Sequence, residues 1–108
     1  MIVEYEKDGR VAVITLNRPE ARNAVSGELA QALEEAVDRF ENDDDLWVGV
    51  LAGNGPVFCA GADLKAVASG NANLGTSRGG FGGFVTLERT KPIIAAVEGP
   101  AVAGGCEL

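Results

Sequence analysis

Two glycine-containing segments carry the residue types needed for acid–base chemistry next to a carbonyl group. They are residues 58–65 (FCAGADLK) and residues 99–108 (GPAVAGGCEL). Each follows an apolar run that predicts a strand, and each is expected to open a helix. The first N–H groups of a helix have no partner within it and carry partial positive charge. Small side chains admit a ligand oxygen close to such groups, so two of them aimed at one oxygen would form an oxyanion hole.

Glu107 supplies the carboxylate that this chemistry requires. It follows Gly104 by three residues, which places it about one helical turn away on the same face. A carboxylate there suits a general acid or base acting at the carbon next to a thioester, while backbone donors stabilise the charge on the oxygen. Simpler interpretations stay open for each part: the glycines form tight turns, Glu107 is a solvated or capping glutamate, and Asp63 caps a helix.

Composition indicates an ordinary globular chain with room for one small domain. The 108 residues are 46% hydrophobic and 23% charged. No apolar run reaches the ~18 residues of a membrane span, so we expect no membrane partner. The N-terminal residues lack the basic stretch and long apolar core of a secretory signal, and we expect a cytoplasmic location.

The charge balance and the residue inventory exclude several kinds of site. Nine basic against sixteen acidic residues give a net charge of −7, which argues against nucleic acid but allows a small phosphorylated ligand. Histidine is absent, and Cys59 and Cys106 lack CxxC spacing, so neither zinc nor a histidine triad is expected. Both cysteines are expected to be small buried residues. Residues 42–45 (NDDD) are expected to form a solvated turn, with a metal site as the alternative.

Hydrophobic periodicity and turn signals predict strands alternating with helices, the pattern of an α/β domain. The expected elements are a hairpin of residues 2–6 and 11–16, a helix capped by Ser26 over residues 29–40, a buried strand over 46–52, a short strand over 57–59, a helical segment over 85–89 and a buried strand over 93–97. Residues 69–83 are rich in Gly, Asn and Ser and are expected to form a mobile loop near a site. They lack the Gly-Lys-Ser/Thr ending of a P-loop.

Five blocks of sequence, in this order along the chain, resemble the crotonase superfamily of enoyl-CoA hydratases and isomerases. They are LNRP (16–19), NA (23–24), FCAGADL (58–64), KPIIAAV (91–97) and GGCEL (104–108). The resemblance covers essentially the whole chain and implies a crotonase (ClpP-like) spiral of ββα units. Residues 1–108 would form the N-terminal part of a single domain, apparently truncated because the chain stops where a helix should begin. It also implies homotrimers, often paired into hexamers.

The resemblance implies a set of site residues. The thioester oxygen would lie between the N–H groups of Ala62 and Gly104, and Glu107 matches the first of two catalytic glutamates of hydratases. The implied substrate- and CoA-binding residues are Arg22, Ala24, Ala60, Ala62, Asp63, Leu64, Lys65 and Gly104. Arg18, Arg22 and Lys65 would offset the mismatch between an acidic protein and anionic CoA. Neither a metal nor a separate cofactor is implied, because CoA enters as part of the substrate.

The function that the resemblance implies is a lyase of fatty acid metabolism. It would hydrate 2-trans-enoyl-CoA reversibly to 3-hydroxyacyl-CoA through an enolate of the thioester. Two alternatives stay open: Δ3-Δ2 isomerisation of enoyl-CoA, and a non-catalytic homologue that only binds acyl-CoA. A second glutamate beyond Leu108 would favour hydration over isomerisation.

Overall fold

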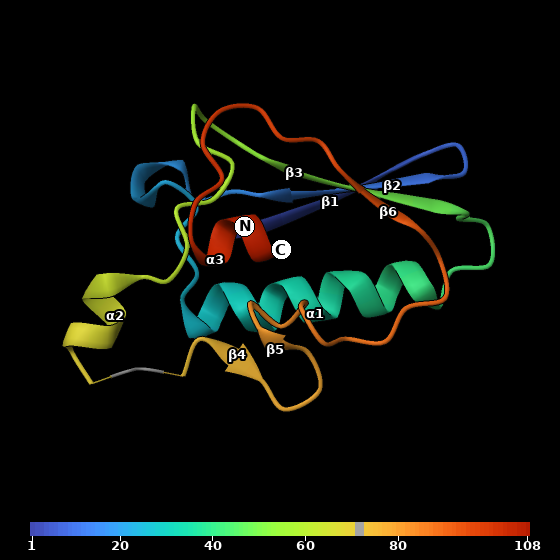
Figure 1. Cartoon of the computed structure of the whole chain (residues 1–108). Helices are drawn as coiled ribbons and strands as arrows, with labels where there is room; N and C mark the ends of the chain where they lie inside the picture. The colour runs from blue at the N-terminus through green and yellow to red at the C-terminus, as the bar shows by residue number, and fades with distance from the viewer. Residues whose placement is uncertain (71–72) are drawn as a thin grey trace.

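A four-stranded sheet with one long helix along it forms the centre of the computed structural model, which describes residues 1–70 and 73–108 (Figure 1). The sheet has the order β1-β2-β3-β6; β1 and β2 are antiparallel and the other pairs are parallel. The sheet strands are β1 (Val3–Asp8), β2 (Val11–Leu16), β3 (Val48–Gly53) and β6 (Ile93–Ala95). The remaining elements are the 3-10 turn η1 (Pro19–Ala21), helices α1 (Gly27–Glu41), α2 (Leu64–Ala68) and α3 (Gly104–Glu107), and the small sheet of β4 (Gly75–Thr76) and β5 (Gly80–Phe81).

The predicted N-terminal hairpin and long helix are both confirmed. Asp8 pairs with Val11 across the hairpin, so the chain reverses over two residues. At the start of α1 the Ser26 hydroxyl accepts a hydrogen bond from the Leu29 N–H at 3.2 Å, as expected of an N-cap. The apolar face of α1 is buried. Its buried residues are Leu29, Ala30, Leu33, Ala36, Val37 and Phe40.

No helix among the described residues is long and apolar enough to cross a bilayer.

Ion pairs explain the acidic turn after α1. Asp43 lies 2.7 Å from the Lys7 ammonium, and Asp45 lies 3.8 Å from the Arg10 guanidinium. Both cations come from the hairpin. The acidic turn therefore contacts the sheet through ion pairs at the protein surface. Within residues 1–70 and 73–108, no cluster of three or more acidic or sulfur ligands is arranged to hold a metal ion.

Two short elements predicted from the sequence do not form. Residues 57–59 form no strand, because the Asn23 amide donates to the carbonyls of Val57 and Phe58 and leaves only an isolated bridge at Cys59. Residues 85–89 form no helix. The turn before them contains two glycines with φ of +68° and +67°, and such angles do not begin a right-handed helix.

The apolar run at residues 93–97 is a strand over 93–95, but the prediction that it is buried on both faces is wrong. Ile94 is 60% exposed and Val97 is 50% exposed. Among the described elements β6 pairs with β3 alone, and the sheet face to which Ile94 points is left uncovered. Glu41 fixes the approach to β6, since its carboxylate accepts hydrogen bonds from Thr90 and Lys91. Burial raises the pKa of Glu41, but these hydrogen bonds outweigh it and hold the pKa below its usual value.

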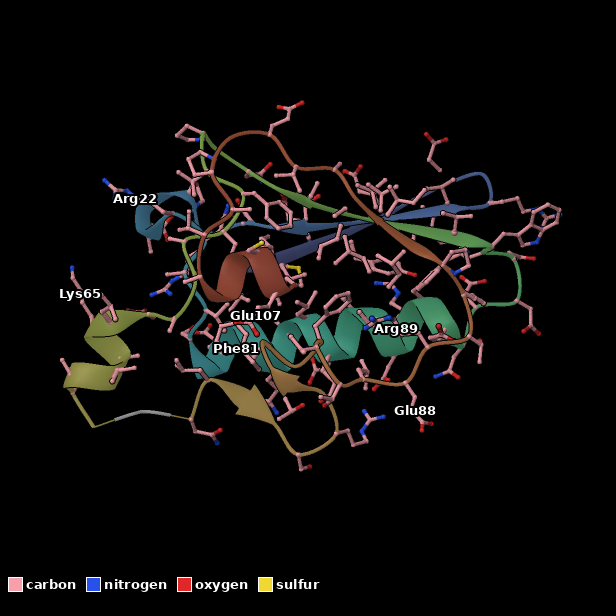
Figure 2. The ribbon with its side chains drawn as sticks, in the orientation of Figure 1. Arg22, Lys65, Phe81, Glu88, Arg89 and Glu107 are labelled. Atoms are coloured by element: carbon pink, nitrogen blue, oxygen red, sulfur yellow. The ribbon has the colours of Figure 1, made fainter. Side chains whose placement is uncertain are left out.

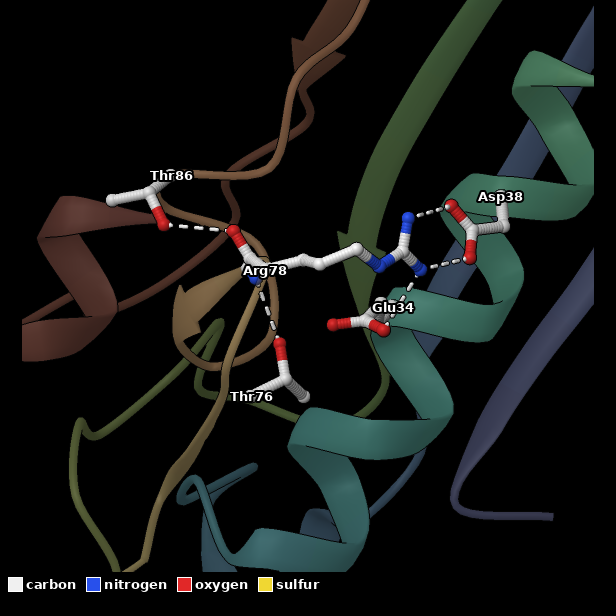
Figure 3. A network of polar contacts seen from close by, with 6 residues as sticks. Glu34, Asp38, Thr76, Arg78 and Thr86 are labelled. Atoms are coloured by element: carbon white, nitrogen blue, oxygen red, sulfur yellow. Dashed lines mark hydrogen bonds and ion pairs between the residues drawn. The ribbon is translucent and has the colours of Figure 1, made fainter.

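The predicted loop at residues 69–83 contains a small hairpin attached to α1. Residues 71 and 72 lie outside the described residues. Arg78 lies 2.9 Å from the Glu34 carboxylate and 2.6 Å from that of Asp38, both on α1 (Figure 3). The Thr86 hydroxyl donates to the Arg78 carbonyl and so ties the turn after β5 to the residue that anchors the hairpin. The mobility of this segment stays a prediction.

Candidate functional site

The two glycine-containing junctions lie side by side. Cys59 bridges Ala101 in parallel, and the Val102 N–H donates to the Cys59 carbonyl at 3.2 Å. Gly61 has φ of +96°, and a Cβ added to it would lie 3.2 Å from the Gly104 nitrogen. A side chain at Gly61 would therefore occupy the space in front of the Gly104 amide. The tertiary structure brings together the two segments that the sequence analysis singled out.

The Ala62 N–H has no acceptor among the described residues because Ala62 lies in an isolated β-bridge with Val25, and not because it begins a helix. The Val25 N–H donates to the Gly61 carbonyl at 2.7 Å, and the Asp63 N–H donates to the Val25 carbonyl at 2.8 Å. Successive residues of an extended chain point in opposite directions, so the N–H of Ala62 faces away from Val25. Helix α2 begins two residues later, with Asp63 as its N-cap.

The Gly104 N–H opens α3, as predicted from the glycine pair. Neither this N–H nor that of Ala62 donates a hydrogen bond to any residue that the structure describes. Ala103, which precedes Gly104, has φ of 49° and ψ of −124°, a conformation rare for any residue with a Cβ. The ψ angle of Ala103 sets the plane of the next peptide and hence the direction of the Gly104 N–H. Nothing in the sequence marks Ala103 for this role, since alanine ordinarily adopts negative φ.

A cavity of about 670 Å³ lies beside Ala62. Its lining residues are Arg18, Glu20, Ala21, Arg22, Ala24, Ala60, Ala62, Asp63, Leu64 and Lys65. Seven of the eight residues predicted to bind CoA are among them; Gly104 is the exception. Leu64 offers an apolar surface, being 77% exposed. Arg22 and Lys65 extend away from the ribbon (Figure 2) and form no ion pair within the described parts of the chain.

Asp63 lines this cavity, but its carboxylate is already engaged. One oxygen accepts the N–H groups of Lys65 and Ala66 at 3.0 and 3.2 Å and so caps α2. The other lies 2.8 Å from the Arg18 guanidinium. The hydrogen bond from Arg18, with help from the Ala66 N–H, holds the pKa of Asp63 below its usual value. Since the Arg18 charge is paired, Arg22 and Lys65 are the lining cations without an ion-pair partner among the described residues.

Glu107 lines a second cavity, of about 360 Å³. Seven of its ten lining residues are apolar and three are charged, yet most of the surface facing the cavity is polar. The walls are formed by Leu51, Phe84, Val85, Arg89, Lys91, Pro92, Ile93, Ala95, Glu107 and Leu108. Glu107 is exposed and makes neither a hydrogen bond nor an ion pair with any described residue, so its carboxylate is free to meet water or a ligand. Cys59 is buried as predicted, but Cys106 is exposed because it lies on the outer face of α3.

Phe81 packs against Gly104, one of the predicted site residues, and the sequence did not predict this contact. A Cβ added to Gly104 would lie 2.6 Å from two carbons of its ring. A Cβ added to Gly82 would lie 2.9 Å from the Leu108 side chain, so the residue after β5 lies close to the residue after α3. Phe81 is the only aromatic residue in the Gly-rich segment 69–83, and that was the available signal.

The family model for enoyl-CoA hydratase/isomerase matches residues 6–108. The chain belongs to this family. The EchA19 enoyl-CoA hydratase of Mycobacterium tuberculosis is 43% identical over 95% of this chain and 41% of its own length. The short-chain-enoyl-CoA hydratase of Clostridium acetobutylicum is 40% identical over 98% of this chain and 42% of its own length. This member of the enoyl-CoA hydratase/isomerase family thus spans about two fifths of the length of the curated relatives it matches.

Solved structures confirm the predicted crotonase fold. A probable enoyl-CoA hydratase/isomerase from Mycobacterium abscessus has a TM-score of 0.89 and 50% identity, over 98% of this chain and 41% of that protein. A carnitinyl-CoA dehydratase from Mycobacterium avium 104 has a TM-score of 0.93 and 44% identity, over 98% of this chain and 43% of that protein. The β1-β2-α1 unit and the strands that follow are therefore the N-terminal part of the α/β architecture of this family.

Proposed function

We propose that this chain holds an acyl-CoA thioester and belongs to an enzyme that hydrates 2-trans-enoyl-CoA to 3-hydroxyacyl-CoA. One observation carries the proposal: two backbone N–H groups, from Ala62 and Gly104, have no acceptor among the described residues and flank Gly61 where two chain segments meet. The relatives named enoyl-CoA hydratase support the same reaction.

The two amides would stabilise the charge that hydration creates. In the proposed reaction the oxygen of water bonds to carbon 3, and the electron pair of the double bond moves toward carbon 2 and the thioester oxygen. The Ala62 and Gly104 N–H groups donate to that oxygen, and losing one such donor typically costs ~10²–10³ in rate. Glu107 takes the proton of the attacking water, because its carboxylate is otherwise unengaged by the described residues. The protonated Glu107 then gives a proton to carbon 2, which completes the addition of water and restores the carboxylate.

The cavity beside Ala62 suits the CoA portion of the substrate. Arg22 and Lys65 line it as cations and can attract phosphates to a chain whose net charge is −7. The exposed Leu64 side chain offers apolar contact to the pantetheine arm. CoA is thus proposed as part of the substrate, and no separate cofactor is invoked. The homotrimeric or hexameric assembly and the cytoplasmic location stay predictions.

The test is the loss of enoyl-thioester absorbance with crotonyl-CoA, measured on the natural protein that contains this chain. We expect Glu107→Gln to lower turnover about 100-fold or more while binding of the CoA ester survives. Glu98→Gln is the matched control, because Glu98 is an exposed glutamate that lines neither cavity. An unchanged rate in E107Q would remove Glu107 from the mechanism. Double-bond migration without added water would indicate an isomerase, and binding without turnover a non-catalytic homologue.

A further inference from the structure

We propose that the ion pair between Arg18 and Asp63 sets the direction of the Ala62 N–H, which makes Arg18 a positioning residue for the thioester carbonyl. The inference rests on the proposed function, because it assigns the pair a task at the same oxygen. Asp63 follows Ala62 directly in the chain, whereas Arg18 comes from the loop after β2. The pair therefore joins two segments that are far apart in sequence and adds a side-chain link to the backbone bridge between Val25 and Ala62.

A single guanidinium holds both segments that flank the Val25–Ala62 bridge. One terminal nitrogen of Arg18 lies 2.8 Å from the Asp63 carboxylate, and the other donates to the Ala24 carbonyl at 2.8 Å. Ala24 precedes Val25, and Asp63 follows Ala62. Arg18 thus cross-links the two strands beside the peptide whose N–H is free. The planar, rigid fork of arginine suits two acceptors at a fixed angle, whereas lysine offers one point charge.

Arg18 is held at its backbone as well as at its guanidinium. The Arg18 backbone N–H donates to the Asn23 side chain at 2.8 Å, and Asn23 is fully buried. The Arg18 side chain is 23% exposed and that of Asp63 is 11% exposed, so water competes little for the charge-assisted hydrogen bond. Oxyanion donors must be held to within about 0.5 Å and 10–20° of their working geometry.

Asp63 has two tasks that substitution can separate. One oxygen caps α2, and the other pairs with Arg18. Asparagine is as good an N-cap as aspartate, so Asp63→Asn keeps the cap and removes the ion pair. Arg18→Lys keeps the positive charge but cannot contact Asp63 and the Ala24 carbonyl at the same time. Arg18→Met loses the charge and both contacts. Arg10→Met is the matched control, because Arg10 pairs with Asp45 on the exposed surface.

The experiment measures kcat, KM and the carbonyl stretching frequency of a bound dienoyl-CoA by Raman spectroscopy, on the natural protein that contains this chain. We expect kcat to fall about 10- to 100-fold in D63N and R18M, with KM nearly unchanged. The shift of the carbonyl frequency on binding should shrink in the order wild type, R18K, R18M, and R10M should match wild type. A merely structural role would lower the melting temperature without moving this frequency.

The outcomes separate the inference from the proposed function. Wild-type protein that binds no CoA ester, or binds it without a carbonyl shift, would overturn the oxyanion hole itself. A wild-type shift that persists in folded D63N and R18M, with kcat unchanged, would overturn the positioning role alone. Circular dichroism establishes folding, and R18K gives the same comparison should D63N fail to fold.

Discussion

The ring of Phe81 lies against Gly104, next to the position that a Cβ of residue 104 would occupy. Two ring carbons lie 2.6 Å from that position, well inside van der Waals contact. Phe81 belongs to a hairpin that Arg78 fastens to α1 (Figure 3), so the ring has a firm support. Gly104 is therefore required by what packs on it as well as by the ligand proposed to bind its N–H.

Gly104→Ala should lower turnover of enoyl-CoA about 100-fold or more, because the new methyl group must displace the ring or turn the peptide away from the thioester oxygen. Steady-state hydration of crotonyl-CoA measures the effect. The double variant F81A/G104A removes the clash and should regain a large part of the rate, with F81A alone as its reference. A G104A rate equal to wild type would show that this peptide has no part in the reaction.

Replacing Arg22 and Lys65 together by methionine should weaken binding of enoyl-CoA about 2- to 30-fold and leave kcat unchanged. Two exposed cations facing phosphates contribute roughly 0.2–1 kcal/mol each, and salt screens them. Calorimetric titration at low and high salt measures the loss. Crotonyl-pantetheine, which lacks the nucleotide, should bind both proteins equally. Equal weakening for both ligands would place the CoA phosphates elsewhere.

Asn23→Ala should lower the free energy of unfolding by about 3 kcal/mol or more. The fully buried amide of Asn23 donates to three carbonyls, of Asn54, Val57 and Phe58, and each buried group left unsatisfied costs about 1–3 kcal/mol. Urea unfolding measures the change. Asn42→Ala is the control, since Asn42 is exposed and should shift stability by no more than about 0.5 kcal/mol. A similar loss in the free energy of unfolding for N23A and N42A would show that the buried hydrogen bonds of Asn23 add no stability.

Ala103→Gly should stabilise the chain by about 0.5–2 kcal/mol. A Cβ-bearing residue at φ of 49° and ψ of −124° stores about 1–3 kcal/mol, and the extra freedom of glycine in the unfolded state takes back about 0.5–1 kcal/mol. Thermal and urea unfolding provide the measurement. Ala32→Gly within α1 should instead destabilise by about 1 kcal/mol. Destabilisation by A103G would mean that Ala103 is not strained.

The stability difference between wild type and D63N should depend on pH with a definite sign. The Arg18 guanidinium lowers the pKa of Asp63 in the folded state. The stabilisation is therefore complete above the unfolded value of about 3.9 and is lost as pH falls through the lower, folded pKa. Urea unfolding of both proteins between pH 7 and pH 2.5 should show two curves that converge on the acid side. If the difference in the free energy of unfolding between wild type and D63N did not change with pH, the Asp63 carboxylate would contribute no charge-dependent stability.

Local signals in the sequence were sufficient where the physical cause is local. The Asp-Gly turn of the hairpin, the Ser26 cap and the apolar period of α1 each depend on residues within a few positions of one another, and all three are confirmed. The apolar run at 93–97 shows the limit of such signals. Its hydrophobicity indicated burial, but exposure depends on which strands and helices lie beside β6, and Ile94 is 60% exposed at the sheet edge.

By itself the sequence determined the residue types at the two junctions, the carboxylate one turn after Gly104 and the resemblance to the family. Only the tertiary structure decided that the Ala62 N–H has no acceptor in the described part of the chain, that Phe81 packs on Gly104 and that Asp63 is shared between a helix cap and Arg18. The physical reason is that a peptide N–H points away from whatever pairs with its neighbours. Those partners, Val25 and Arg18, lie some forty residues away along the chain and meet Ala62 only when the chain folds.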